Sequence, residues 1–242
     1  MWSPAEFEAR LRAVGERRYH HLHPFHVRMH AGELSKEEFQ GWVINRYYYQ
    51  IKIPVKDAHI LAKLPTRQDR RRWIKRIYDH DGREGEEGGI ELWLRLGEAV
   101  GIPRERMASC EEVLPATRFA VDAYVTFCQT RPWLEAVASA ITELFAPGLI
   151  SKRIEDVRKH YPWIEPEGLA YFHNRLKQQP KDIEHLLELV LSSATTHEEQ
   201  LRCVKALEFK CDVLWALLDA VEHAYSEGRA PSRRAAAPEA TR

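Results

Sequence analysis

Residues 35–64, SKEEFQGWVINRYYYQIKIPVKDAHILAKL, decide the fold. Ser35 is followed three residues later by Glu38, which is the capping-box pattern that begins a helix. Apolar residues then recur at the spacing of one helix face, at Phe39, Trp42, Val43, Ile44 and Tyr47. The stretch therefore predicts one long helix that runs towards Leu64, with a kink at Pro54.

The same signals extend over most of the chain. Caps or breaks at Ser3, Thr66 and Thr196 predict further helix starts, and Pro24 and Gly32 bound a short helix. The remaining helices are predicted at about 90–101, 117–129, 132–146, 147–159, 166–176, 181–194 and 197–226. No alternating strand, hairpin turn or internal repeat is evident. We expect an all-α, compact bundle over residues 1–226, followed by an Ala/Pro-rich disordered tail or linker at 227–242.

Composition limits the possible partners and compartment. The 242 residues are 44% hydrophobic and 30% charged, with a formal net charge of zero. No overall positive field attracts nucleic acid or an anionic membrane, and no apolar run is long enough for a membrane span. A secretory signal is not evident, and the four cysteines are scattered without a C-x-x-C. These features predict a cytoplasmic protein with reduced thiols and without nucleic-acid or membrane partners.

The histidine-rich stretch RRYHHLHPFH (17–26) raises the question of a metal site. His26 and His30 are four residues apart and could share a helix face, but two imidazoles need a further ligand. No H-E-x-x-H motif is present, and the acidic segment 79–89 fits neither a calcium loop nor a phosphate loop. We expect no metal, and a solvated turn at 79–89.

Polar groups recur beside apolar helix stripes. Pairs spaced i, i+4 are Arg46 and Gln50, Arg76 and His80, and Tyr171 and Arg175; Lys210 and Glu143 also share faces with apolar residues. Any single one of them is more often a surface residue or part of a core ion pair. Together they indicate a polar, mostly positive cavity suited to an anion with several carboxylates, because arginine binds carboxylate in a bidentate manner.

Three consecutive tyrosines, Tyr47, Tyr48 and Tyr49, point in different directions around the predicted helix. At least one of them is expected to face inward, where its hydroxyl needs a partner. Spacing does not separate ordinary packing from a role in the cavity.

Several long blocks resemble the pyrroloquinoline-quinone synthase (PqqC) family over about residues 5–226. They include YHHLHPFH, GWVINRYYYQIKIPVKDA, RIYDHDG, GGIELWLRLGEAVG, LPATRFAVDAY, ITELFAP, HYPWI and EFKCDVLW. The resemblance implies a seven-helix, heme-oxygenase-like fold and a homodimer. It implies the last step of pyrroloquinoline quinone (PQQ) biosynthesis, in which AHQQ closes its third ring and undergoes an eight-electron oxidation. Dioxygen is then the co-substrate, hydrogen peroxide is released, PQQ is the product, and no metal or redox cofactor takes part.

The resemblance also implies roles for individual residues. The catalytic positions correspond here to His80, His20, Tyr171, Arg175, Lys210 and Glu143, and the substrate-binding positions to Tyr19, Arg46, Gln50, Arg76, Tyr124, Thr142 and Arg153. His80 is the implied general base and contact for oxygen or peroxide. The other three histidines of the stretch 17–26, which are His21, His23 and His26, are expected to be structural.

The chain departs from the family at one position. The family commonly reads APxIHxxR where this chain reads APGLISKR, so Ile150 stands in place of a histidine and Arg153 is kept. We expect that the change is either tolerated or slows a late oxidation step. The loss of an acid–base group can leave the rate almost unchanged or lower it by about 10²–10⁴-fold.

Other functions remain open from the sequence. They are a PQQ-binding carrier with little turnover, a metal-dependent oxidase on the same fold, and a thiaminase-like hydrolase, for which Cys128 is the only plausible nucleophile. Some members of the family are fused to the small PqqD domain. The tail at 227–242 therefore raises the possibility of a fused or associated PqqD.

Overall fold

The computed structural model describes residues 1–145 and 147–226, with the side chains of 143, 144, 147 and 178–183 left out. Over these residues the chain is helical and no strand is present; Arg83 and Glu86 form one isolated bridge. The α-helices are α1 (Pro4–Arg18), α2 (Pro24–Ala31), α3 (Lys36–Lys63), α4 (Arg67–Asp81), α5 (Gly89–Ala99), α6 (Arg104–Ser109), α7 (Pro115–Thr130), α8 (Trp133–Ser139), α9 (Pro147–His160), α10 (Ala170–Ser193) and α11 (His197–Tyr225). Three 3-10 helices, η1 (His20–Leu22), η2 (Ala140–Phe145) and η3 (Pro166–Leu169), connect some of them.

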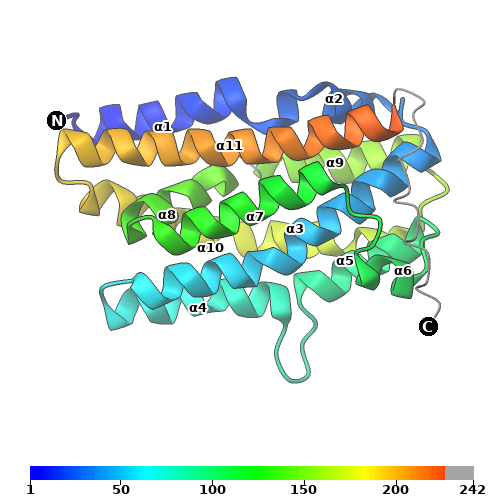
Figure 1. Cartoon of the computed structure of the whole chain (residues 1–242), viewed down its shortest axis with the longest axis horizontal. Coiled ribbons are helices and arrows are strands. Elements are labelled where there is room, and N and C mark those ends of the chain that lie inside the picture. The colour runs from blue at the N-terminus through cyan, green and yellow to red at the C-terminus, as the bar shows by residue number, and fades with distance from the viewer. Residues whose placement is uncertain (146, 227–242) are drawn as a thin grey trace, which may run out of the picture.

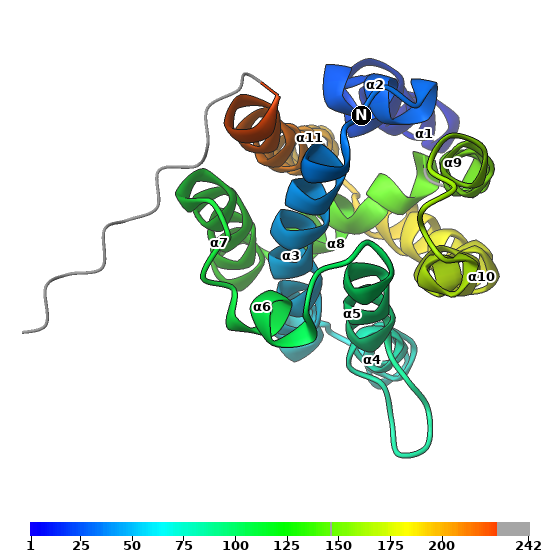
Figure 2. The ribbon, with the colours of Figure 1, turned by 90° about the vertical axis from the view of Figure 1, so that its right-hand side faces the viewer.

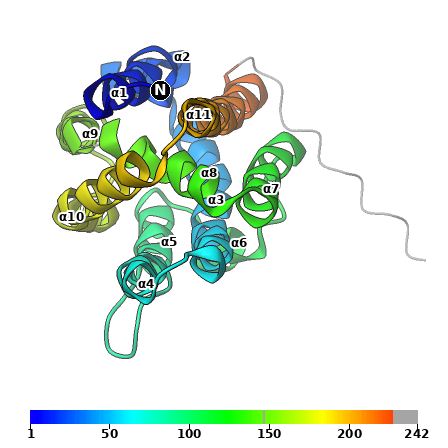
Figure 3. The ribbon, with the colours of Figure 1, turned by 90° about the vertical axis from the view of Figure 1, so that its left-hand side faces the viewer.

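The helices form one bundle around α3 and α8. Figure 1 shows α1, α11 and α7 running along the long axis of the molecule, with α4 below them. Seen from the end in Figure 2, α3 lies in the middle, with α7 and α11 on one side and α9 and α10 on the other. The opposite end, in Figure 3, shows α8 beside α3 at the centre. Positions far apart in sequence therefore face one interior.

The central helix begins as the sequence predicts. Ser35 accepts from the Glu38 N–H and the Glu38 carboxylate accepts from the Ser35 N–H, so the capping box is complete. Pro54 lies inside α3, which continues as one helix to Lys63. Sixteen residues of α3 are buried, because it packs against α4, α5, α7 and α11 on different sides.

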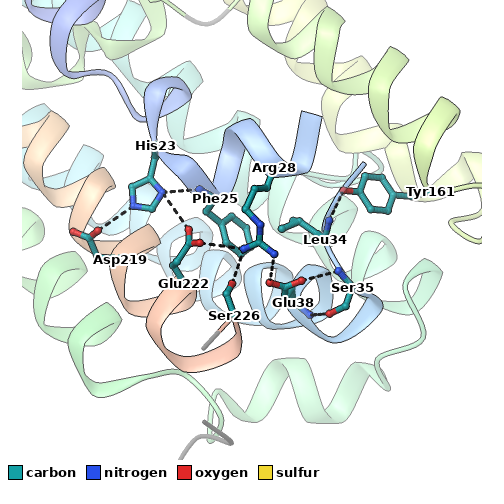
Figure 4. Close-up of polar contacts among 10 residues, drawn as sticks. All are labelled: His23, Phe25, Arg28, Leu34, Ser35, Glu38, Tyr161, Asp219, Glu222 and Ser226. Carbon is teal, nitrogen blue, oxygen red and sulfur yellow. Dashed lines mark hydrogen bonds and ion pairs between the residues drawn. The ribbon is translucent and has the colours of Figure 1, made fainter. Parts of the chain in front are cut away.

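A polar network fixes the first part of the chain to α3 and α11 (Figure 4). Arg28 donates to Glu38 at 2.6 Å and to Glu222 at 3.0 Å, which joins three helices. His23 accepts from the Phe25 N–H through Nδ1, so its Nε2 carries the proton and donates to Asp219 at 3.0 Å. His23 is thus held by structural contacts, as the sequence predicts.

The all-α prediction is confirmed, whereas some helix boundaries were wrong. The expected break between 176 and 181 does not occur, and α10 runs through Pro180 as one helix, because packing against α5, α8 and α9 overrides local propensity. The short α6 was not predicted. The described residues form eleven α-helices rather than the seven that the resemblance implies, because four short helices lie between seven of 14 residues or more (α1, α3, α4, α7, α9, α10 and α11).

The segment expected to be a solvated turn, 79–89, joins α4 to α5 through an exposed loop that projects from the bundle in Figure 1. The predicted tail at 227–242 lies outside the described residues. Across residues 1–145 and 147–226, no helix combines the length and the apolar character that crossing a bilayer requires.

Candidate active site

A cavity lies in the interior of the bundle. Its volume, counted as the space that the centre of a water molecule can occupy, is about 110 Å³. It is lined by residues of η1 and its flanks, α2, α3, α4, α5, η2, α9, α10 and α11: Tyr19, His20, His21, His26, Trp42, Arg46, Tyr49, Gln50, Ile53, His80, Trp93, Thr142, Leu149, Ile150, Arg153, Tyr171, Phe172, Arg175 and Leu214.

The structure brings nine of the thirteen predicted site residues to this cavity. They are Tyr19, His20, Arg46, Gln50, His80, Thr142, Arg153, Tyr171 and Arg175. Lys210, Tyr124 and Arg76 are buried but are not part of the lining. The side chain of Glu143 lies outside the described ones. The polar cavity inferred from helix spacing is therefore present, and the individual chemical roles stay predictions.

The lining is strongly cationic. Arg46, Arg153 and Arg175 line it, and no carboxylate is among the described lining side chains. Arg153 faces the rings of Trp42 and Phe172, at 5.5 and 5.9 Å. Its Nε is buried without a hydrogen-bond partner among the described residues. Burial and the nearby Arg46 lower the pKa of Arg153 to about 10. Such a site favours an anionic ligand, which would compensate the positive charge.

Lys210 lies one layer behind the wall. It is 1% exposed and donates to the Tyr49 hydroxyl, which belongs to the lining. Its Nζ lies 3.7 Å from the centre of the Tyr124 ring. Burial, and then the charges of Arg46 and Lys56, lower the pKa of Lys210 well below its ordinary value. Tyr124 has its hydroxyl 3.2 Å from that of Ser139, and burial raises the pKa of this phenol.

Arg76 is held behind the cavity by a buried carboxylate. Asp57 is fully buried and accepts from Lys56 at 2.7 Å, with the Nε of Arg76 at 3.7 Å. This anion offsets part of the positive charge of Lys56 and Arg76 behind the cavity, whereas Arg46, Arg153 and Arg175 lie on the lining itself.

His80 is placed by the last turn of α4. Its Nδ1 lies 3.1 Å from the Arg76 carbonyl oxygen, which can only accept, so Nδ1 carries the proton. In the neutral ring the lone pair is then on Nε2, as a general base requires. The backbone behind it is tight, because a Cβ on Gly88 would come within 2.3 Å of the His80 carbonyl oxygen. Tyr171 completes this side and donates to Gln50 Oε1 at 3.1 Å.

Two further histidines were expected to be structural but line the cavity. The half-buried His21 contributes to the lining, and His26 is 1% exposed. His26 donates from Nδ1 to the His20 carbonyl oxygen at 3.0 Å, and its Nε2 is buried without a partner in the described part of the chain. Burial and neighbouring cations lower the pKa values of His20 and His26, so both imidazoles are neutral near pH 7.

The pair His26 and His30 does not share a ligand site. His30 faces Asp156 instead, at 2.6 Å. Among the described residues, no group of three or more histidine, cysteine or acidic side chains is placed to hold a metal ion. Cys128, the nucleophile that a thiaminase-like hydrolase would need, is fully buried and absent from the described lining, and burial raises its pKa.

The apolar part of the lining was not identified from the sequence. Trp42, Trp93, Phe172 and Leu214 read as ordinary core residues, because periodicity does not separate a core face from a cavity face. The sequence did not distinguish Tyr49 from Tyr47 and Tyr48 as the tyrosine that faces the cavity. Ile150 lines the cavity beside Leu149, so the departure from the family pattern falls on the wall itself.

Comparisons with known proteins agree with this geometry. The chain is 54% identical to the pyrroloquinoline-quinone synthase of Pseudomonas syringae pv. tomato over 229 residues, covering 95% of this chain and 91% of that protein. It is also 54% identical to the pyrroloquinoline-quinone synthase of Cronobacter sakazakii, with the same coverage.

Solved structures show the fold. A domain with a heme-oxygenase-like fold from Shewanella denitrificans OS217 superposes with a TM-score of 0.74 at 17% identity, covering 96% of both chains. A TenA homologue from Pseudomonas syringae pv. tomato superposes with a TM-score of 0.69 at 14% identity, covering 90% of this chain and 92% of the other. The predicted heme-oxygenase-like fold is thereby confirmed. The sequence profile of the TENA/THI-4/PQQC family matches residues 8–220, and the chain belongs to this family as a relative of its pyrroloquinoline-quinone synthases.

Proposed function

We propose that this protein catalyses the last step of PQQ biosynthesis. In this step AHQQ closes its third ring and undergoes an eight-electron oxidation to PQQ, with dioxygen as oxidant and release of hydrogen peroxide. The names of relatives that are more than half identical to the chain support this assignment.

The observation that carries the proposal is the positive charge that the described residues place on the cavity wall. Three arginines line it and Lys210 lies directly behind it, whereas no described lining side chain is a carboxylate. AHQQ and PQQ carry several carboxylates and quinone oxygens. Arginine forks bind carboxylates, and fixed cations stabilise the negative charge that develops on reduced quinone oxygens.

The lining residues also suit proton transfer. His80 presents the tautomer with the lone pair on Nε2 and can accept a substrate proton, while Tyr171 offers a hydroxyl held by Gln50. The electrons can pass from the electron-rich substrate directly to dioxygen. The protein then positions the substrate, moves protons and stabilises charge, and we propose that it needs neither a metal nor a redox cofactor.

Ile150 favours one alternative. An apolar, non-titrating side chain in the wall is compatible with a protein that binds PQQ and carries it with little turnover. The Ile150→His variant separates the two functions, because it places a titratable group at that position of α9 without changing the arginines.

The assembly and the compartment belong to the same proposal. We expect a cytoplasmic homodimer that takes a small-molecule substrate, without nucleic-acid or membrane partners. Association with a PqqD domain, fused or separate, is the expected protein partnership.

The test is the conversion of AHQQ in air by the purified protein and by the Ile150→His variant, with mass spectrometry of the product and an assay for peroxide. We expect the wild type to form PQQ and peroxide. Tight PQQ binding without turnover in the wild type, with turnover in Ile150→His, would instead identify a carrier. Activity that requires added iron or manganese would favour the metal-dependent oxidase.

A further inference from the structure

The three consecutive tyrosines of α3 have different surroundings. Tyr48 donates to Asp122 of α7 at 2.9 Å, away from the cavity. Tyr47 is buried, and burial raises the pKa of its phenol. Among the three, only Tyr49 belongs to the cavity lining. The position of its phenol cannot be read from the spacing of the tyrosines.

Two basic side chains meet at Tyr49. Lys210 donates to its hydroxyl oxygen, with 2.5 Å between Nζ and that oxygen. The guanidinium of Arg46 and the Nζ of Lys210 both lie 4.1 Å from the centre of the ring. The charge of Arg46, and that of Lys210 once it has taken up a proton, stabilise negative charge on the phenol oxygen.

Lys210 can release its proton more readily than a solvated lysine. It is 1% exposed, its Nζ packs against the Tyr124 ring, and burial together with nearby cations lowers its pKa. A buried lysine of this kind acts as a base, which arginine cannot do. The contact between Lys210 and Tyr49 therefore joins a group that accepts a proton to a hydroxyl that faces the substrate space.

We propose that Tyr49 and Lys210 form a proton-transfer pair, with Tyr49 as a catalytic residue at the cavity wall and Lys210 as the proton acceptor behind it. The inference rests on the proposed oxidation of AHQQ. It adds a second proton route to the one through His80.

In each two-electron oxidation the substrate gives up two protons and two electrons, and dioxygen takes up both and leaves as hydrogen peroxide. One proton moves from the substrate to Nε2 of His80. The other moves from a substrate C–H or N–H group to the Tyr49 oxygen, as the phenol proton moves to the lone pair of the neutral Lys210 amine. His80 and the pair then each return one proton to the reduced oxygen, which restores neutral His80, the phenol and the neutral amine.

The test compares Tyr49→Phe with the matched control Tyr48→Phe in single turnovers of AHQQ with dioxygen across pH 6 to 10. Tyr49→Phe keeps the ring beside Arg46, so we expect PQQ affinity within about 3-fold of wild type. We expect its oxidation rate to fall by about 10²-fold, with one ionisation lost from the pH profile. Tyr48→Phe should react at the wild-type rate.

A second variant separates charge from proton transfer. Lys210→Arg places a permanent cation beside Tyr49 that cannot accept a proton, so we expect a rate as low as that of Tyr49→Phe, together with retained PQQ binding. A Tyr49→Phe variant that reacts as fast as Tyr48→Phe, or that is slow with an unchanged pH profile, overturns the pair. Failure of the wild type to convert AHQQ overturns the proposed function itself, a result distinct from a failure of Tyr49 alone.

Discussion

At the scale of single residues, the chain keeps groups that weaken its own stability. Arg153 is half-buried, and its Nε has no hydrogen-bond partner among the described residues. His20 and His26 are buried as neutral rings. A protein selected for stability alone would pair or replace them. Their arrangement around one cavity indicates that the missing partner is the ligand.

Arg153 gives the first prediction. We expect Arg153→Met to leave the unliganded protein at least as stable as wild type, because it removes a charge that has no ion-pair partner among the described residues. PQQ affinity should fall by about 10- to 100-fold, since a hydrogen bond to a charged group contributes about 1.5–3 kcal/mol. Thermal unfolding and an absorbance titration measure the two effects. The exposed Arg158→Met on the same helix is the control, and equal PQQ affinity in both variants would contradict the role of Arg153.

The buried histidines predict how stability depends on pH. Burial lowers the pKa of His20 and His26 from the ordinary value of 6.5, so below pH 6.5 the unfolded chain binds protons more readily than the folded one. Their contribution to stability is present above that pH and is lost as the pH falls towards the folded pKa values. His26→Asn keeps a donor for the His20 carbonyl but cannot titrate.

The free energy of unfolding in urea, measured between pH 7.5 and 5, should therefore fall less steeply in His26→Asn than in wild type. The difference can reach about 1.4 kcal/mol per pH unit for one proton. Identical slopes in the two proteins would show that His26 is not held neutral.

At the scale of elements, the end of α4 and the start of α5 set the position of His80. A Cβ on Gly88 would lie 2.3 Å from both the His80 carbonyl oxygen and the Gly82 nitrogen, which are backbone atoms that cannot move aside. We expect Gly88→Ala to cost about 1–3 kcal/mol of stability and to lower the oxidation rate. Gly148→Ala, where a Cβ meets nothing within 4 Å, is the control. Wild-type activity in Gly88→Ala would show that this contact does not position His80.

Helix α9 is the element that we expect to move. It contributes Leu149, Ile150 and Arg153 to the cavity and is joined to α2 through His30 and Asp156. In the sequence, Pro147, Gly148, Pro162 and Gly168 break the pattern over 147–175, which predicts a lid. In the structure Pro147 and Gly148 begin α9, and Pro162 and Gly168 lie between α9 and α10. Limited proteolysis should cut this segment more slowly when PQQ is bound. Equal cleavage with and without PQQ would count against a lid.

Local sequence signals predicted the helices more accurately than they predicted the residues that line the cavity. Capping boxes at Ser3, Ser35 and Thr196 and the left-handed Gly32 mark helix ends in the structure as in the sequence. The break predicted between 176 and 181 is absent, since a proline such as Pro180 is compatible with a helix that its neighbours hold. Packing between elements is a tertiary property that periodicity does not report.

At the scale of the whole molecule, the fold converts scattered polar positions into one site. Helices from both halves of the chain place Arg46, His80, Arg153 and Arg175 on a common cavity. The i, i+4 pairs predicted a positive cavity, and the resemblance to a family named its residues. Neither could identify Trp42 or Trp93 as lining, or separate Tyr49 from Tyr47 and Tyr48, because these depend on how α3 is rotated against α5 and α11.

The central claim is that this cationic cavity oxidises a polycarboxylate with dioxygen and without a metal. The most direct measurement is a single turnover in which metal-depleted protein is mixed with AHQQ, first without oxygen and then with it, and is followed by absorbance and mass. The account predicts no oxidation before oxygen is added and full conversion to PQQ with peroxide afterwards. No conversion after oxygen is added, with activity restored by iron or manganese, would contradict it.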